Sequence, residues 1–241
     1  MIRNFNLVLQ VILCLTVFSS CFKEDDYDNV KVGDILTFDV NNQVVPADGT
    51  STANIIVRVS KDAIPTRRSV VFKTDHGSFL GGKGDSLVVD AGGLYLAAAQ
   101  LVATKIGNAK VTASIAGYKL ENTTPITFIK AFPIAIAVKV DSFAIQNTFK
   151  SEIKILASLQ AKEGVPTQGH PVLFSALTDS NTSIGFFLNG ITTATTNNEG
   201  IASIRFSAGI NGYIGRIRLL ATSKKEDNSS ISDTTFIYLT N

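Results

Sequence analysis

Apolar and polar residues alternate in many short segments of the chain after residue 33. Every second residue is apolar in the segments 36–40, 53–59 and 202–206, and Gly, Asn, Asp and Pro stand between such segments. A period of two places one face of a strand against a core and the other in water. Many short strands separated by turn residues favour a β-sandwich. The pattern therefore predicts an all-β protein.

Two segments also suit a helix. Residues 96–101 (LAAAQL) and 151–162 (SEIKILASLQAK) are rich in Ala, Leu, Lys, Gln and Glu, which are good helix formers. The second segment also alternates from Ile153 to Leu159. Its place in an internal repeat decides in favour of a strand.

The two halves of the chain match at three places, with offsets that grow from 102 to 108 residues. Such self-similarity indicates a tandem array. We predict two copies of one sandwich, at 34–129 and 134–241, joined by a linker at 130–133. The matching pairs are 69–74 (SVVFKT) with 171–176 (PVLFSA), 90–94 (DAGGL) with 197–201 (NNEGI), and 107–111 (GNAKV) with 215–219 (GRIRL).

A succession of motifs runs through the first half: PADGTSTA at 46–53, Ile64-Pro65, Val70–Phe72, GSFLG at 77–81 and DAGG at 90–93. It resembles the invasin/intimin type of bacterial immunoglobulin-like domain over essentially all of residues 34–129. The resemblance implies two tandem immunoglobulin-like β-sandwiches. In that family such domains are mostly stalks that present a separate lectin-like tip for adhesion, and we expect no such tip after residue 241.

The second half is identified as a divergent member. It keeps the Val-Leu-Phe strand and the Asn-Glu-Gly turn, but it has AIQNTF at 144–149 in place of a clear Ala-Asp-Gly-Thr opening. Glycine suits turns that need a left-handed backbone. We expect this conformation at Gly49, Gly93 and Gly200, and we interpret all three as folding residues.

The N-terminus has the layout of a secretory signal peptide at residues 1–20. Arg3 precedes an apolar run at 5–18, which contains Asn6 and Gln10 and is short for a membrane-spanning helix. A retained anchor helix is the weaker alternative. The segment FSSC at 18–21 resembles a bacterial lipoprotein processing site, in which Cys21 becomes the first mature residue and carries a diacylglycerol. Phe18 departs from the usual Leu, and an ordinary signal peptide with a chance cysteine is the alternative.

Residues 21–33 are predicted to be a lipidated acidic tether. The segment FKEDDYD at 22–28 is acidic and resembles an export signal that sends lipoproteins to the outer face of the outer membrane in some Gram-negative bacteria. Cys14 lies in the removed segment, so Cys21 is the single cysteine of the mature chain and no intramolecular disulfide is possible. We therefore predict an outer-membrane lipoprotein that is exposed at the cell surface.

The overall charge argues against a nucleic-acid partner. The chain has 22 Lys and Arg against 20 Asp and Glu, and only Arg3 falls in the predicted signal peptide. Binding to nucleic acid needs a concentrated basic face. The sequence predicts none.

The segment GSFLGGKG at 77–84 falls one residue short of a phosphate-binding loop. Gly84 stands where such a loop has a magnesium-binding Ser or Thr, and the next residues, 85–90, are β-branched rather than helical. We predict no nucleotide and no other cofactor. Phe79 and Leu80 are expected to return to the core, which leaves Gly82, Lys83 and Gly84 as candidate partner contacts.

No catalytic or metal-binding pattern is found. The two histidines, His76 and His170, occupy non-equivalent places in the repeat, and we expect both to be solvated loop residues. There is no GxSxG or HExxH motif, and Asp75, Asp85 and Asp90 lack the spacing of a calcium loop. The sequence therefore predicts a protein that is not an enzyme.

Two functions remain open. The leading hypothesis is a lipid-anchored cell-surface spacer or adhesion module, held in the membrane through Cys21, with a surface protein or glycan as partner. The alternative is a glycan-binding accessory lipoprotein of an outer-membrane carbohydrate uptake system. The chain has no Trp, and its Phe residues stand mostly at strand positions, where we expect core packing.

Overall fold

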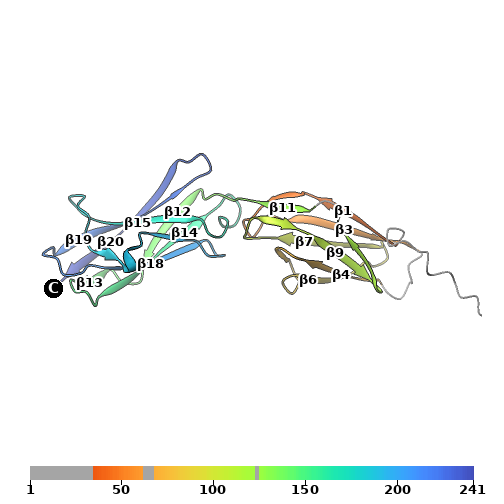
Figure 1. Ribbon diagram of the computed structural model, residues 1–241, viewed down its shortest axis with the longest axis horizontal. Helices are drawn as coiled ribbons and strands as arrows, with labels where there is room; N and C mark the ends of the chain where they lie inside the picture. The colour runs from red at the N-terminus through yellow and green to blue at the C-terminus, as the bar shows by residue number, and fades with distance from the viewer. Residues whose placement is uncertain (1–34, 62–67, 123–124) are drawn as a thin grey trace, which may run out of the picture.

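The computed structural model describes residues 35–61, 68–122 and 125–241. The predicted signal peptide, Cys21, the acidic tether and the Ile64-Pro65 motif lie outside these residues. The described chain forms two β-sandwiches placed end to end, with its first strand in one sandwich and Asn241 at the opposite end of the long axis (Figure 1). The prediction of two tandem β-sandwiches is confirmed.

The first sandwich has a four-stranded sheet in the order β1-β3-β7-β5. Facing it is a second layer with the orders β10-β9-β4-β6 and β2-β11-β8. All its pairings are antiparallel except β2 with β11. The strands are β1 (Leu36–Asn41), β2 (Val44–Pro46), β3 (Ala53–Val59), β4 (Ser69–Thr74), β5 (Ser78–Phe79), β6 (Ser86–Asp90), β7 (Leu96–Val102), β8 (Gly107–Ala109), β9 (Val111–Ile115), β10 (Tyr118–Glu121) and β11 (Ile126–Ile129).

The second sandwich repeats this plan with the sheets β12-β14-β18-β16 and β13-β20-β19-β15-β17. Here β13 pairs in parallel with β20, as β2 does with β11. The elements are β12 (Ala135–Val140), β13 (Ala144–Gln146), β14 (Glu152–Gln160), β15 (Pro171–Thr178), β16 (Phe186–Phe187), the 3-10 turn η2 (Leu188–Gly190), β17 (Thr193–Thr195), β18 (Ile201–Ser207), β19 (Gly215–Lys224) and β20 (Ser230–Thr240).

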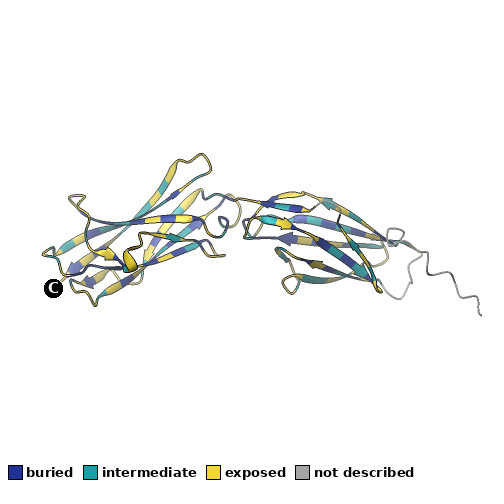
Figure 2. Ribbon diagram, in the orientation of Figure 1, coloured by how far each residue is buried: buried dark blue, intermediate teal, exposed yellow. Residues whose placement is uncertain are grey.

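Each sandwich has its own hydrophobic core. The buried residues fall into one cluster within 36–128 and another within 138–239, and buried and exposed positions alternate along the strands (Figure 2). Phe72 and Phe128 are fully buried in the first core, and Phe174 and Phe206 in the second. Burying one such side chain contributes about 1.5–3 kcal/mol. The apolar positions that alternate in the sequence are therefore the ones that face the two cores.

Both segments that also suit a helix are strands. In β7, Ala97, Ala99 and Leu101 are buried, and β14 buries every second residue from Ile153 to Leu159. Pairing with neighbouring strands and burial of one face outweigh helix propensity here. No helix in the described part of the chain has the length and apolar character needed to cross a membrane.

The predicted equivalence of Gly93 and Gly200 is wrong by two residues. Strands β7 and β18 share one burial pattern from Leu96 and Ile201 onward, which sets the offset at 105 rather than 107. The left-handed residue before β18 is Gly200, at φ 74°, and its counterpart before β7 is Tyr95, at φ 56°. Arg68 lies 4.7 Å above the Tyr95 ring and donates a hydrogen bond to its hydroxyl. The two repeats are therefore aligned correctly by the buried faces of their strands, and aligning Gly93 with Gly200 shifts the repeats by two residues. Gly49, at φ 79°, has the predicted conformation, whereas Gly93 does not, and the left-handed glycine of its turn is Gly92, at φ 55°.

Candidate functional site

The phosphate-loop look-alike forms a turn between two strands. After β5 the chain turns back with bonds from Phe79 N to Gly84 O and from Lys83 N to Ser86 O, and β6 follows where a phosphate loop has a helix. Phe79 is buried as predicted, but Leu80 is 46% exposed, contrary to prediction. Leu80 directly follows β5 and its amide still bonds to Gln100 O at 3.0 Å. Neighbouring side chains of an extended chain point to opposite faces, so Phe79 and Leu80 cannot both face the core.

The turn places Lys83 and Gly84 at the surface, with Gly82 partly covered. Gly82 sits tightly, since a side chain there would come 2.6 Å from Ser86 O. These three residues stay a predicted partner contact. Cys21, the predicted lipidation site, lies outside the described residues.

The turn at Asp48, between β2 and β3, forms the end of the first sandwich that meets the second. The Asp48 side chain is 3% exposed. It accepts hydrogen bonds from the amides of Thr50 (2.8 Å) and Ser51 (2.6 Å) and from the Ser51 hydroxyl (2.6 Å). A carboxylate that accepts several such bonds fixes the turn. The Ala-Asp-Gly-Thr motif thus builds a rigid docking surface.

The connection from β14 to β15 lies on this surface. Val165 N donates to Asp48 O at 3.0 Å, and Gln168 N donates to Thr104 O at 2.8 Å. The Thr167 hydroxyl accepts a hydrogen bond from the Ala131 amide at 2.7 Å and donates one to Ala47 O at 3.2 Å. Thr167 is 5% exposed. Buried, satisfied hydrogen bonds of this kind couple the two sandwiches.

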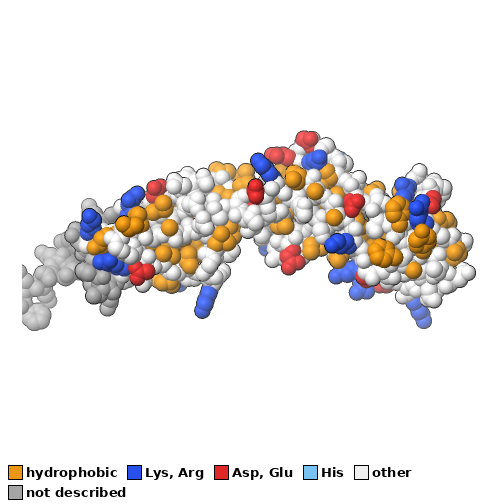
Figure 3. Space-filling model, turned by 180° about the vertical axis from the view of Figure 1, so that it is seen from behind, with side chains coloured by type: hydrophobic (Ala, Val, Ile, Leu, Met, Phe, Trp, Pro, Cys, Tyr) orange, Lys and Arg blue, Asp and Glu red, His pale blue; other side chains and the backbone are white. Residues whose placement is uncertain are grey.

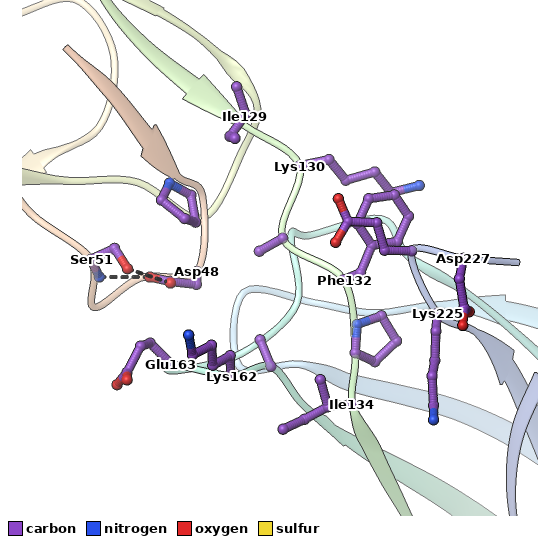
Figure 4. Close-up of a pocket in the computed structure, with 15 residues that line it drawn as sticks. Asp48, Ser51, Ile129, Lys130, Phe132, Ile134, Lys162, Glu163, Lys225 and Asp227 are labelled. Atoms are coloured by element: carbon purple, nitrogen blue, oxygen red, sulfur yellow. Dashed lines mark hydrogen bonds between the residues drawn. The ribbon is translucent and has the colours of Figure 1, made fainter. Parts of the chain in front are cut away.

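An open groove lies beside the junction. Figure 4 shows Asp48 and Ser51 on one side of it and Lys162 and Glu163 on the other. The turn of the β19–β20 hairpin, with Lys225 and Asp227, borders the same groove. The lining carries both acidic and basic side chains, so it presents no strongly charged site. Within the described ranges, no group of three or more His, Cys, Asp or Glu side chains is placed to hold a metal ion.

The expectation that His170 is a solvated loop residue is wrong. His170 is 3% exposed at the junction. Its Nε2 lies 3.1 Å from Lys224 O, its Nδ1 is buried without a hydrogen-bond partner, and its ring meets Phe132 edge-on at 6.1 Å. Lys130 lies 4.6 Å above the Phe132 ring. Burial, followed by the charge of Lys130, lowers the pKa of His170 below 6.5, against an opposing effect of the Lys224 carbonyl.

We expect the protein to lose stability as the pH falls from about 6.5 towards the lower pKa of folded His170. In this window the unfolded chain binds a proton at His170 and the folded chain resists it, because the folded pKa is the lower one. Thermal unfolding over this range measures the effect, and His170→Gln should flatten it. The control is His76→Gln, whose ring nitrogen also lies against a carbonyl oxygen, that of Lys105, at 3.0 Å. Equal slopes for the wild type and His170→Gln would contradict the expectation.

Comparisons with known proteins concern the fold. No protein-family model matches the chain, and no curated protein matches it in sequence. The crystal structure of invasin, a bacterial integrin-binding protein, matches with 21% identity and a TM-score of 0.55, over 85% of this chain and 39% of invasin. The Yersinia pseudotuberculosis adhesin InvE matches with 16% identity and a TM-score of 0.49, over 88% of this chain and 60% of its own.

The chain thus spans less than two thirds of the length of each of these structures. The resemblance seen in the sequence agrees with the strand orders and with the likeness to invasin. It also agrees with the one parallel pairing in each sandwich, of β2 with β11 and of β13 with β20. The chain has the fold of two tandem bacterial immunoglobulin-like domains of the invasin/intimin type.

Proposed function

We propose that this protein is a non-enzymatic, lipid-anchored cell-surface module that serves as a spacer or in adhesion. The observation that supports it best is the junction: the two sandwiches are joined end to end by hydrogen bonds at Asp48, Thr104 and Thr167 rather than by a bare linker. A stiff junction keeps the far end of the second sandwich away from the end where the chain enters the first (Figure 1). Both spacing and adhesion use this geometry.

The anchor in this proposal is a diacylglycerol on Cys21, in the outer membrane, at the end of the acidic tether. The longest strands have 7 residues in the first sandwich and 11 in the second. At ~3.3 Å per residue these lengths are about 23 Å and about 36 Å, so the pair reaches about 60 Å from the tether. The two acyl chains of a diacylglycerol hold such a module at the membrane, whereas a single chain would bind only marginally. The surface turn at Gly82–Gly84 is available along this length as a lateral contact.

The alternative is a glycan-binding accessory lipoprotein of an outer-membrane carbohydrate uptake system. One finding favours it. The aromatic side chains are not confined to the cores, since Phe143 is 69% exposed and Phe149 is 60% exposed in the second sandwich. Exposed rings offer flat apolar faces on which sugars stack. Binding of the mature protein to a glycan array would support this function.

Cys21→Ser tests the anchor and the location together. In the native host we expect the wild type to incorporate labelled palmitate, to fractionate with outer membranes and to be removed from intact cells by added protease. The variant should lose the label and appear in the soluble fraction. A wild-type protein that takes up no palmitate would overturn the lipid anchor. A protein protected from protease in intact cells, yet cleaved after lysis, would overturn the surface location.

A further inference from the structure

The far end of the second sandwich is the structural counterpart of the end of the first sandwich that receives a partner. Strand β13 pairs with β20 in the register in which β2 pairs with β11. The next amides make equivalent bonds, from Ala47 N to Ile129 O (2.8 Å) and from Asn147 N to Thr240 O (2.9 Å). The turn at Thr148 therefore occupies the place of the turn at Asp48.

This equivalence shows three changes at matching positions. From the paired strands, Phe149 stands in the place of Gly49. Phe186 pairs with Ser207, the last residue of β18, as Ser78 pairs with Val102, the last residue of β7, so Phe186 stands in the place of Ser78. Ile210 is the third residue after β18 and Lys105 the third after β7, so Ile210 stands in the place of Lys105. Small or polar residues at the end of the first sandwich thus become two aromatic residues and one aliphatic residue. We call Phe149, Phe186 and Ile210 the end patch.

The end patch is exposed and its rings are close together. Phe149 is 60%, Phe186 42% and Ile210 73% exposed, and the two ring centroids are 6.1 Å apart. Gly209, at φ 69°, lies beneath both rings, since a side chain there would come 3.3 Å from Phe186 and 3.5 Å from Phe149. Figure 3 shows hydrophobic side chains gathered at this end of the molecule, on the right, with Lys and Arg among them.

The first sandwich shows what covers such an end. There the covering group is a polypeptide loop, whose amides at Val165 and Gln168 donate to the carbonyl oxygens of Asp48 and Thr104. The counterpart carbonyls on the second sandwich belong to Thr148 and Gly209. The two ends share one backbone path, but Thr148 O already accepts bonds from the Ser151 amide and the Ser207 hydroxyl, both at 3.4 Å. The second sandwich therefore offers a loop its side chains more than this carbonyl.

The charge beside the end patch is positive. Lys150 follows Phe149 and is exposed, and none of the ion pairs found among the described residues includes it. Glu152 pairs with Ser207, which also pairs with Phe186, and the Glu152 carboxylate is neutralised by Arg205 at 3.2 Å. Lys150 is therefore the cation next to the patch. A partner with an acidic group suits this rim, and a second copy of the same cationic end does not.

We propose that the end patch docks a polypeptide loop of a partner protein, which places an apolar side chain on Phe149 and Phe186 and a carboxylate near Lys150. This proposal deepens the adhesion role proposed above and rests on it. Aromatic anchors carry much of the energy of protein interfaces. Exposed apolar patches of this kind are typical of contact sites. The nearby positive charge selects acidic partners and makes binding weaken with salt.

The test uses a phage-displayed library of random peptides, panned on the purified mature chain. We expect the enriched peptides to combine an aromatic or aliphatic residue with Asp or Glu. The variant Phe149→Gly, Phe186→Ser, Ile210→Lys gives this end the residues of the first sandwich, and it should weaken binding of an enriched synthetic peptide by at least about tenfold. The control, Leu94→Ser, removes a residue that is 83% exposed on the first sandwich and should leave binding unchanged.

Unchanged thermal unfolding of the triple variant shows that it folds. Lys150→Glu, which keeps both rings, should also weaken binding and reduce its dependence on salt. The proposal is overturned if no peptide is enriched or if the triple variant binds as the wild type does. The same follows if binding is abolished by Lys83→Ala, in the turn of the first sandwich, and by none of the changes in the end patch. It is also overturned if the patch instead supports glycan binding or self-association, measured by a glycan array and by sedimentation. Because the purified chain is used, failure here leaves the result of the palmitate and protease experiment intact.

Discussion

Replacing Gly164 by Ala should uncouple the two sandwiches. Gly164 has φ 61°, and a single added Cβ would overlap the carbonyl oxygen of Asp48 and come 2.7 Å from the Thr50 hydroxyl. The Asp48 turn is fixed by its own hydrogen bonds, so it cannot give way cheaply. A left-handed backbone at a non-glycine residue costs about 1–2 kcal/mol, and each lost junction hydrogen bond costs about 0.5–1.5 kcal/mol. We expect the coupling to weaken by about 3 kcal/mol.

Small-angle X-ray scattering measures the outcome as a broader range of particle dimensions, and calorimetry measures it as two unfolding transitions in place of one. Gly169→Ala is the matched control. Gly169 has φ 87°, so it bears similar backbone strain, but an added Cβ there meets no atom within 4 Å. The control should lose about 1–2 kcal/mol of stability and keep the wild-type scattering curve. Equal scattering from both variants would show that contact with Asp48 does not hold the sandwiches together.

Most of the fold could be predicted from the sequence because the alternation of apolar and polar side chains shows which face of each strand is buried. Phe72 and Phe206, at alternating positions in the sequence, are fully buried in the two cores. The helix-like segment LAAAQL could be assigned to a strand only by tertiary contacts, since Ala and Leu satisfy both periods locally. Pairing with β3 supplies the information that propensity lacks.

The errors have a common physical cause, which is that contacts distant in sequence decide them. His170 looks like a solvated loop residue until Phe132, from the chain before β12, covers it. Tyr95 adopts the left-handed backbone that glycine would suit, with Arg68 against its ring. Phe149 and Phe186 are 37 residues apart in the sequence, and each taken alone would be interpreted as a core residue. Only the paired strands bring them together at one surface.

Replacing Asp48 by Ala should destabilise the first sandwich and its junction at once. The buried carboxylate accepts four hydrogen bonds, two each from Thr50 and Ser51. Bonds to a charged group contribute about 1.5–3 kcal/mol each, with part of the loss recovered when water solvates the freed amides. Because the same turn presents its carbonyl to Val165, its collapse also disturbs the second sandwich. We expect a loss of about 3–4 kcal/mol in the free energy of unfolding.

Denaturant unfolding of Asp48→Ala measures this loss, and the equivalent turn supplies the control. Thr148 occupies the same place in the second sandwich but makes one exposed side-chain bond, to the Ser151 hydroxyl at 3.0 Å. Thr148→Ala should therefore cost less than about 1 kcal/mol. Asp48→Asn keeps one acceptor oxygen and should fall between the two. If Asp48→Ala costs no more than Thr148→Ala, the Asp48 carboxylate does not organise the junction, and the stiffness of the two-sandwich rod must come from Thr167 and its neighbours.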